Sequence, residues 1–360
     1  MTEHSEHEYR RARLLPGLKK AHAGAFLTTA LPNVRYLSGF TGSNAALLMT
    51  ADRAVLFTDP RYQTQAPQES DCEIKIVKGP LLPEVGKWLK RLKVKALAFE
   101  QNRISFDEYQ QLKEAGKDVR LKPLAGIVEE LRMVKSPAEI ATIRASVQLN
   151  SAALEQALAQ FRPSMTEVDL AAEIEYRMRR LGADGTAFET IVASGRRSAL
   201  PHAHPTDHAI QTDQLLLVDM GASVAGYASD MTRTHAVGKL GAKVRRMYRA
   251  VLESQLAAID AVKPGIPCAN VDRAARQVLR SYGLDKLFIH STGHGLGLEI
   301  HERPRIGRKE ETKLEPGMVI TVEPGVYDEA LGGIRIEDTV VVTEHGCEVL
   351  TPTPKDLAVL

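Results

Sequence analysis

Short apolar runs alternate with helical patterns in the first third of the chain. The runs that predict strands cover residues 25–27, 45–49, 54–58 and 96–99. Between them, residues 83–92 predict a helix, and Ser105 with Glu108 forms a capping box that predicts the start of another. We therefore expect one small α/β domain in this part of the chain.

The pattern changes near residue 135, where a long helix is expected to begin. Ser136 is a good N-cap, Pro137 suits the first helical position, and Glu139 completes a capping box. Apolar residues then recur at three- and four-residue steps on one face, at Ile140, Ile143, Val147, Leu154, Leu158 and Phe161. We expect residues 1–130 to form an N-terminal domain and residues 131–360 to form a second domain.

The second domain contains a weak internal repeat. The stretch from Pro163 to Asp169 resembles the stretch from Pro264 to Asp272, and each follows a long amphipathic helix. Two copies are too few for a solenoid. We expect a pseudo-symmetric domain with a site at the seam between its halves.

Composition and charge narrow the classes of function. The 360 residues exceed what one hydrophobic core usually organises, and 44% of them are hydrophobic, which suits two folded domains. The 47 basic and 45 acidic residues leave a formal net charge of +2, so no surface for a polyanion is indicated. Nucleic acid is not expected as a partner.

Neither the N-terminus nor the cysteines indicate secretion. Residues 1–13 are charged and rich in histidine, and no stretch approaches the ~18 apolar residues of a membrane span. Cys72, Cys268 and Cys347 lie far apart, are odd in number and lack metal-binding spacing. We expect a cytoplasmic protein with no membrane partner.

Two aspartates stand in unusual positions beside apolar runs. Asp219 ends such a run, where a carboxylate costs several kcal/mol unless a cation or hydrogen-bond donors compensate it. Asp230 follows Gly221 and Gly226, so a hairpin could bring both acids to one face. Taken singly, Asp219 could cap a turn and Asp230 could pair with Arg233.

Two glutamates further along repeat this arrangement. Glu323 and Glu337 are each embedded in a run of β-branched residues, which predicts four acids in four apolar strands. Such a group requires positive charge. His294 adds an imidazole, and the glycines around it would permit close approach of a substrate or a metal.

Four carboxylates with one imidazole suit two divalent cations better than one. Oxygen-rich ligation with a single imidazole is typical of manganese, cobalt, zinc or iron. Two ions about 3.5–4 Å apart can bridge and acidify a water that attacks a carbonyl.

This set of residues resembles the ligands of a known family. The order Asp219, Asp230, His294, Glu323, Glu337, with the motifs Ser-Thr-Gly-His-Gly-Leu-Gly, Glu-Pro-Gly-Val-Tyr and Gly-Ile-Arg-Ile-Glu-Asp, is similar to the pita-bread metallopeptidases. That family includes methionine aminopeptidase, aminopeptidase P, prolidase and the metal-free creatinase. Residues 33–43 and 59–62 resemble its creatinase-type N-terminal domain, so the resemblance covers nearly the whole chain. It implies an α/β (α+β) fold, in which a creatinase-like N-terminal α/β domain precedes a pseudo-symmetric pita-bread catalytic domain.

The resemblance also implies a role for each ligand. Asp219 would hold one metal through both oxygens, His294 would bind the other, and Asp230 and Glu337 would bridge the two. Glu323 would ligate one metal and carry a proton from the attacking water to the leaving proline nitrogen. Mn²⁺ is expected first, with Co²⁺ and Zn²⁺ as alternatives.

Four histidines need separate assignment. His202 matches the family's substrate histidine, which leaves His204 as a solvent-facing or loop residue. His301 is expected to hydrogen-bond the scissile carbonyl or its oxyanion, and His290 to line the proline side.

Arg335 and Tyr327 match positions that support the ligands from outside. Arg335 lies two residues before Glu337, on the same strand face. Its structural alternative, a partner for a neighbouring acid, is compatible with that role. The alternative for Tyr327 is a core tyrosine.

The N-terminal domain favours the Xaa-Pro branch of the family. The expected activity is that of a dinuclear Xaa-Pro aminopeptidase, which hydrolyses the bond before proline in peptides with proline at the second position. Residues 39–43 and 59–62 look closest to short bacterial aminopeptidases P, and the alternative is an Xaa-Pro dipeptidase (prolidase). A metal-free binding protein on the same fold is a third hypothesis, against which the intact ligands argue. The resemblance further implies a homodimer.

Overall fold

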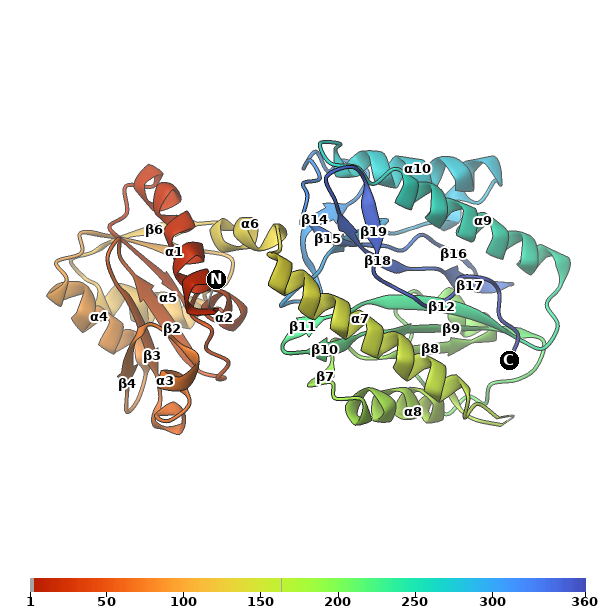
Figure 1. The fold of residues 1–360 in the computed structure, drawn as a ribbon, viewed down its shortest axis with the longest axis horizontal. Coiled ribbons are helices and arrows are strands. Elements are labelled where there is room, and N and C mark those ends of the chain that lie inside the picture. The colour runs from red at the N-terminus through yellow and green to blue at the C-terminus, as the bar shows by residue number, and fades with distance from the viewer. Residues whose placement is uncertain (1–2, 163) are drawn as a thin grey trace. The chain divides into compact units, whose positions relative to one another are not determined.

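The computed structural model describes residues 3–162 and 164–360, which form two compact units (Figure 1). The first unit ends at Arg132 and the second begins at Met133. Met1 and Thr2 of the charged N-terminus, and Pro163 at the start of the predicted repeat, lie outside the described residues.

The first unit is built on a mixed six-stranded sheet in the order β4-β3-β2-β1-β5-β6. Its strands are β1 Ala25–Thr28, β2 Ala45–Met49, β3 Ala54–Thr58, β4 Glu73–Ile76, β5 Ala96–Glu100 and β6 Arg120–Leu124. Pairs β1–β2 and β2–β3 are antiparallel, and the other three pairs are parallel. Its helices are α1 Glu3–Lys20, α2 Leu31–Ser38, α3 Ala66–Glu69, α4 Leu81–Arg91, α5 Phe106–Ala115 and α6 Ile127–Met133, with the short 3₁₀ turn η1 Pro60–Tyr62.

The four strands predicted for this unit are confirmed because their apolar residues fill its core. β1 and β2 are buried along their whole length. β4 and β6 were not predicted; they lie at the two edges of the sheet, and their polar and apolar residues alternate over only a few positions. The predicted capping box is also confirmed, since the Glu108 amide donates to Ser105 Oγ at 3.2 Å. Helix α1 was not predicted, although it buries Leu14 and Leu18.

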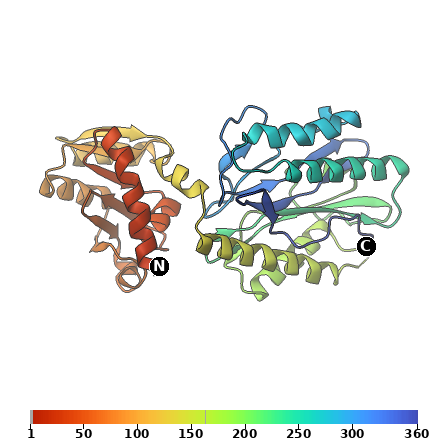
Figure 2. The ribbon, with the colours of Figure 1, turned by 45° about the horizontal axis from the view of Figure 1, so that its top comes forward.

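The second unit places its sheets between two pairs of helices, as both ribbon views show (Figures 1 and 2). The first pair is α7 Pro137–Leu158 with α8 Glu167–Arg180, and the second is α9 Ala242–Asp260 with α10 Cys268–Ser281. Each pair packs against strands in a separate hydrophobic cluster. The unit therefore consists of two similar halves, in agreement with the predicted pseudo-symmetry.

The first half carries two three-stranded sheets, β12-β9-β8 and β11-β10-β7. Their strands are β7 Gly185–Thr186, β8 Ile191–Ser194, β9 Gln214–Met220, β10 Ala222–Val224, β11 Tyr227–Ala228 and β12 Met231–Val237, and the 3₁₀ turn η2 Gly195–Ala199 follows β8.

The second half carries the five-stranded sheet β14-β13-β15-β18-β19 and the hairpin β16-β17. The elements are η3 Asp285–Leu287, β13 Gly293–Gly295, β14 Glu302–Ile306, β15 Val319–Val322, β16 Gly325–Asp328, β17 Gly332–Arg335, β18 Asp338–Val342 and β19 Cys347–Val349.

The long helix α7 begins where the sequence predicts. Ser136 Oγ accepts from the Glu139 amide at 3.3 Å, and the Glu139 carboxylate accepts from the Ser136 amide at 2.9 Å. Ile143, Val147 and Leu154 of its apolar face are fully buried.

The repeated segments cap the second helix of each pair. Thr166 and Asp169 form a capping box at the start of α8, whereas Pro267 occupies the N-cap of α10. Asp272, the counterpart of Asp169, is instead buried and pairs with Arg276 at 2.8 Å. The repeat thus preserves the position of a helix start, while its polar residues make different contacts.

No helix among the residues of the described ranges has the length and apolar character to cross a bilayer.

Candidate metal centre

Asp219 and Asp230 come from the sheet of the first half. Asp219 is the penultimate residue of β9, and Asp230 directly precedes β12. The strands pair antiparallel with Asp219 opposite Thr232, which brings the two acids to neighbouring positions. The hairpin β10–β11 makes the connection, and both Ala225 and Gly226 at its tip have positive φ.

Glu323 and Glu337 come from the second half, but not from within strands as the sequence predicts. Glu323 lies in the two-residue break between β15 and β16, and Glu337 lies in the corresponding break between β17 and β18. At each break the chain passes between the five-stranded sheet and the hairpin β16–β17. A carboxylate beside an interrupted ladder can point away from the sheet towards the other half.

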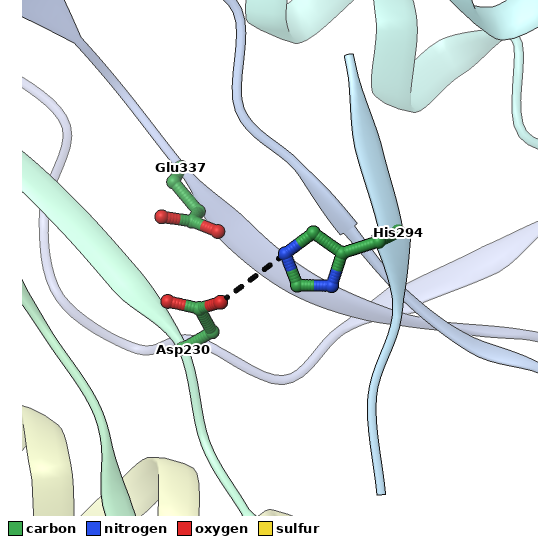
Figure 3. A group of neighbouring side chains, drawn as sticks. All are labelled: Asp230, His294 and Glu337. Atoms are coloured by element: carbon green, nitrogen blue, oxygen red, sulfur yellow. Dashed lines mark ion pairs between the residues drawn. The ribbon is translucent and has the colours of Figure 1, made fainter. Parts of the chain in front are cut away.

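His294 completes the group from β13. One ligand atom each from Asp230, His294 and Glu337 lies within 4.8 Å of the others, and Figure 3 shows the three side chains directed at a common point. His294 Nε2 lies 3.5 Å from Asp230 Oδ2 and 3.5 Å from Glu323 Oε1. Residues from both halves thus meet at the seam.

The glycines beside His294 permit close packing of neighbouring strands. A Cβ added at Gly293 would collide with the carbonyl of Thr321 on the neighbouring strand β15. The Thr321 hydroxyl in turn accepts from the His294 amide at 3.1 Å. The missing side chain therefore permits close packing of two strands, which sets the position of His294.

Burial and mutual repulsion raise the pKa values of the acids. The pKa of Asp230 lies well above its usual value because of burial and then of the charges of Glu337 and Asp219. Burial, and then the charges of Glu323 and Asp219, raise the pKa of Glu337 well above its usual value. Burial raises the pKa of Glu323 to about 7, although Arg335 opposes the shift. Without added positive charge these groups cannot all be ionised.

Arg335 supplies one positive charge from β17. Its Nη2 lies 2.5 Å from Asp219 Oδ2, and its Nε donates to Thr232 Oγ1 at 3.0 Å. Its Nη1 donates to the Tyr327 hydroxyl at 2.7 Å and to the Pro201 carbonyl at 3.2 Å. Arg335 therefore contacts an acid, a tyrosine and the loop that carries His202 and His204.

Two buried oxygens are suited to metal ligation. Among the described residues, Asp219 Oδ1 and Glu337 Oε1 have no hydrogen-bond partner. Their second oxygens are held by Arg335 and by the Thr232 hydroxyl, respectively. Buried acceptors are normally satisfied, so each of these oxygens requires a further partner. Burial lowers the pKa of His294, and the neutral imidazole is the form that binds metals. These residues fit two divalent cations.

The structural alternative for Asp230, an ion pair with Arg233, is wrong. The Arg233 guanidinium lies 2.8 Å from Asp338 and also donates to the carbonyls of Thr353 and Pro354. Residue 233 points away from residue 232 on β12, because neighbouring side chains alternate along a strand. The turn-capping alternative for Asp219 is also wrong, since Asp219 lies within β9.

The predicted outer histidines lie around the acids. His290 Nε2 is 2.8 Å from the Tyr327 hydroxyl, and burial, with Arg335, lowers the pKa of His290 to about 4. The rings of His294 and His301 meet edge to face with centroids 4.4 Å apart. His202 is exposed and close enough to influence the pKa values of both His290 and His301.

His204 lies apart from this group. Its side chain is 76% exposed, and its Nδ1 is 3.0 Å from the exposed carboxylate of Glu189. Its carbonyl accepts from Arg197 at 2.7 Å. The structure thus separates the two histidines of the Pro-His-Ala-His-Pro motif.

Several supporting residues have only a weak signal in the sequence. Thr232 donates to Glu337 at 2.7 Å and accepts from Arg335, but nothing distinguishes it from any strand threonine. Asp272 accepts from Thr292 at 2.9 Å, and Arg276 donates to the backbone at Phe288, so α10 holds the segment that leads to His294. The four-residue spacing of Asp272 and Arg276 on a helix is the signal that could have indicated their pairing.

A basic cleft opens beside His290. It has a volume of about 610 Å³, and its basic side chains are Arg276, Lys286, Arg305, Arg308 and Lys309. Asp285 and Glu310 are its acidic side chains. Arg305, which lines the cleft, stands opposite His294 across the β13–β14 pair.

Comparison with known proteins agrees with these observations. Residues 141–344 match metallopeptidase family M24, and residues 10–134 match the creatinase/prolidase N-terminal domain. The sequence is 38% identical to the Xaa-Pro dipeptidase of Pyrococcus furiosus over 326 residues, which cover 90% of this chain and 92% of that protein.

Two solved structures have the same fold. The Xaa-Pro dipeptidase from Bacillus anthracis has a TM-score of 0.96 and 39% identity, covering 98% of this chain and 100% of that one. The X-Pro aminopeptidase from Thermotoga maritima has a TM-score of 0.89 and 38% identity, covering 96% and 100%. The predicted fold class, a creatinase-like domain followed by a pita-bread domain, is confirmed.

Proposed function

Because the chain belongs to metallopeptidase family M24, we propose that it is an Xaa-Pro dipeptidase that acts with two divalent metal ions. It is an Xaa-Pro peptidase, as are the relatives named above. The observation that carries the proposal is the convergence of Asp230, His294 and Glu337 from two halves of one unit.

Five side chains would hold the metals. Asp219 would bind one ion and His294 the other, with Asp230 and Glu337 between them and Glu323 completing the set. The partnerless oxygens of Asp219 and Glu337 support this assignment. Two divalent cations held here would polarise the scissile carbonyl and acidify the attacking water.

Glu323 is the proposed proton carrier. It would accept a proton from the attacking water and deliver it to the proline nitrogen as the amide bond breaks. A carboxylate beside a metal-held water suits a role that requires it both to gain and to lose a proton. The 3.5 Å distance between Glu323 Oε1 and His294 Nε2 supports its membership of the ligand group.

The outer histidines would contact the substrate. His301 would donate a hydrogen bond to the oxygen of the scissile carbonyl as negative charge develops there, and its ring contact with His294 supports this placement. His202 would contact the substrate from the loop that Arg335 holds through the Pro201 carbonyl. His290 would line the proline side, where a lowered pKa keeps its ring uncharged at neutral pH.

The positive charge of the basic cleft favours a dipeptide substrate over a longer peptide. In an Xaa-Pro dipeptide the proline carries a free carboxylate, whereas in a longer peptide this group is a neutral amide. Arg305, which lines the cleft and stands opposite His294, would pair with that carboxylate. The relatives named Xaa-Pro dipeptidase support the same choice over the aminopeptidase that the sequence motifs rank first.

Xaa-Pro aminopeptidase is the second candidate. The X-Pro aminopeptidase of Thermotoga maritima matches this chain at 38% identity with a TM-score of 0.89, so the same scaffold carries both names. A cleft of about 610 Å³ also offers room beyond the proline ring.

Two substrates distinguish these candidates. With Mn²⁺ titrated into apo protein, we expect turnover of Ala-Pro and at least tenfold lower kcat/KM for Ala-Pro-Ala, because the tripeptide lacks the carboxylate at the proline. Equal or better turnover of Ala-Pro-Ala would establish the aminopeptidase instead. No turnover of either peptide at any metal level would favour the binding protein.

A variant tests the cleft directly. Arg305→Met should raise KM for Ala-Pro by about tenfold or more, because it removes one partner of a charge pair. Arg144→Met is the matched control, since Arg144 pairs with Glu348 at 2.7 Å and neither residue lines the cleft. An unchanged KM in Arg305→Met would remove the argument from the cleft.

Three finer points are also proposed. Mn²⁺ is proposed as the native ion because four carboxylates and one imidazole form an oxygen-rich set. A cytoplasmic location is supported by three free cysteines, two of them buried. A homodimer is proposed from family resemblance.

A further inference from the structure

The first residues of the second unit contact two walls of the metal centre. Lys135 Nζ lies 3.1 Å from Glu302 Oε2, and the two side chains are only 1% and 6% exposed. The Lys135 amide also donates to the Gly317 carbonyl at 2.9 Å. A buried charge pair with a fixed backbone is a rigid attachment.

The Glu302 carboxylate, which binds Lys135, also contacts the turn at residues 297–301. Its other oxygen accepts from the Glu299 amide at 3.1 Å. A Cβ added at Gly297 would lie within 3.0 Å of the Glu302 carboxylate, so the turn is folded closely around that group. His301 directly precedes Glu302 and contacts the ring of His294.

Glu139 makes a second attachment one helical turn later. One oxygen of its carboxylate caps α7 at Ser136, and the other accepts from the Tyr227 hydroxyl at 2.9 Å. Tyr227 begins β11, three residues before Asp230. The two walls are also joined to each other, because the Ala228 amide donates to the Gly297 carbonyl at 2.8 Å.

We propose that Lys135 is a positioning residue, whose ion pair with Glu302 holds the turn at residues 297–301 so that His301 stays beside His294. The kinetic part of this inference rests on the proposed function, and the structural part does not. Lys135 itself is buried against Glu302 and is not one of the proposed ligands or substrate-contacting histidines. Its loss should therefore act through the turn.

Hydrogen exchange tests the structural part. We compare full-length protein with and without Mn²⁺, carrying Lys135→Met or the matched control Arg144→Met. Arg144 on α7 forms a 2.7 Å ion pair with Glu348 on β19, but that pair is much more exposed than the pair of Lys135 and Glu302. Lys135→Met should speed amide exchange at residues 297–302 by about tenfold or more while β9 and β12 are unchanged, because local opening becomes easier. Arg144→Met should leave both regions unchanged.

A double-mutant cycle tests the kinetic part. Lys135→Met should lower kcat for Ala-Pro by roughly 10- to 100-fold with little change in KM, since small displacements of a catalytic group have effects of this size. In the His301→Ala background the same substitution should cause less than about a threefold further loss, because residues that act as a unit are not additive. Lys135→Arg, which keeps the charge, should restore most of kcat.

Several results would overturn the proposal. Equal losses with and without His301 would show that Lys135 acts elsewhere, and unchanged exchange at residues 297–302 would show that the turn does not depend on the pair. Should Lys135→Met fail to fold, Glu302→Gln removes the same charge pair while keeping an acceptor for Glu299, and the same two criteria apply. If exchange rises but no variant, including wild type, hydrolyses Ala-Pro, the proposed function fails and the positioning of the turn stands.

Discussion

Each unit of this protein buries acidic side chains, and the two units stabilise them differently. In the first unit, Asn33 donates to Glu100 at 2.5 Å and to Glu129 at 2.9 Å. Arg103 lies 2.8 Å from Glu129, and Arg132 holds the Asn33 carbonyl oxygen at 2.6 Å. In the second unit, four carboxylates gather around Arg335 and the neutral ring of His294.

The difference lies in how the remaining negative charge is neutralised. Burial raises the pKa of Glu100 to about 7, so a single proton can neutralise it, while Asn33 and Arg103, against the effect of burial, hold the pKa of Glu129 below its usual value. At the seam of the second unit, the acids share one space and raise one another's pKa, so without cations several of them would have to be protonated. A buried acid with its own donors is structural, whereas a surplus of buried acids indicates a cation site.

The largest expected effect on activity comes from removing one of the clustered acids of the second unit. Glu337→Ala should lower kcat/KM by at least about 10³-fold and should weaken the binding of both metal ions. Loss of a residue that only supports a metal ligand typically costs about 10- to 100-fold, and Glu337 is proposed as a ligand itself. Kinetics with Ala-Pro and metal content by mass spectrometry measure this. Asp230→Ala should behave alike.

The matched control comes from the other unit. Glu100→Gln also removes a buried carboxylate and should leave metal content and kcat/KM within about twofold of wild type. Full metal occupancy with normal rates in Glu337→Ala would show that the acids of the second unit are no more important for metal binding than Glu100.

A smaller loss is expected from the charge that supports the ligands. Arg335→Lys keeps one positive charge but cannot reproduce the fork that reaches Asp219, Tyr327 and Pro201 together. We expect a 10- to 100-fold fall in metal affinity or kcat. Metal titration followed by turnover would measure it, and wild-type values would mean that charge alone matters.

The first unit should show its buried acid in the pH dependence of stability. The pKa of Glu100 rises from 4.5 to about 7 on folding, so the folded state binds the proton more tightly than the unfolded state. This contribution stabilises the fold at pH 4.5 and below, and it is lost as the pH rises towards 7. The loss should amount to roughly 2–4 kcal/mol.

Glu100→Gln should abolish that part of the slope. Denaturant unfolding between pH 4.5 and 8, followed by a probe in the first unit such as Trp88, measures it. If the free energy of unfolding has the same pH dependence in wild type and Glu100→Gln, Glu100 stays ionised in the folded protein. Neutralisation by a proton would then not distinguish the first unit from the second.

The smallest effect is expected at His204. Because its side chain is 76% exposed and pairs with an exposed glutamate, His204→Ala should change kcat/KM by less than about twofold. His202→Ala, two residues earlier on the same loop, is the control and should lower kcat/KM by about 100-fold, the scale of a lost oxyanion donor. Similar losses in both variants would mean that the whole loop contributes to the site.

Much of the fold could be predicted because its signals are local. The strands of the first sheet appear as apolar runs, and Ser136 with Glu139 specifies the start of α7 through contacts three residues apart. The edge strands β4 and β6 were not predicted, since their alternation of polar and apolar residues extends over only a few positions. Helix α1 was not predicted because most of its residues are charged or polar.

The sequence by itself determined which residue types could form the site and their order along the chain, because an acid in an apolar run is unusual wherever it occurs. Only the tertiary structure decided which acids carry surplus charge. Arg233 pairs with Asp338 rather than the nearby Asp230, and Arg335 reaches Asp219 across 116 positions. Likewise Lys135 meets Glu302 across 167 positions. Such pairings depend on distance in space, which no local pattern of hydrophobic and polar residues records.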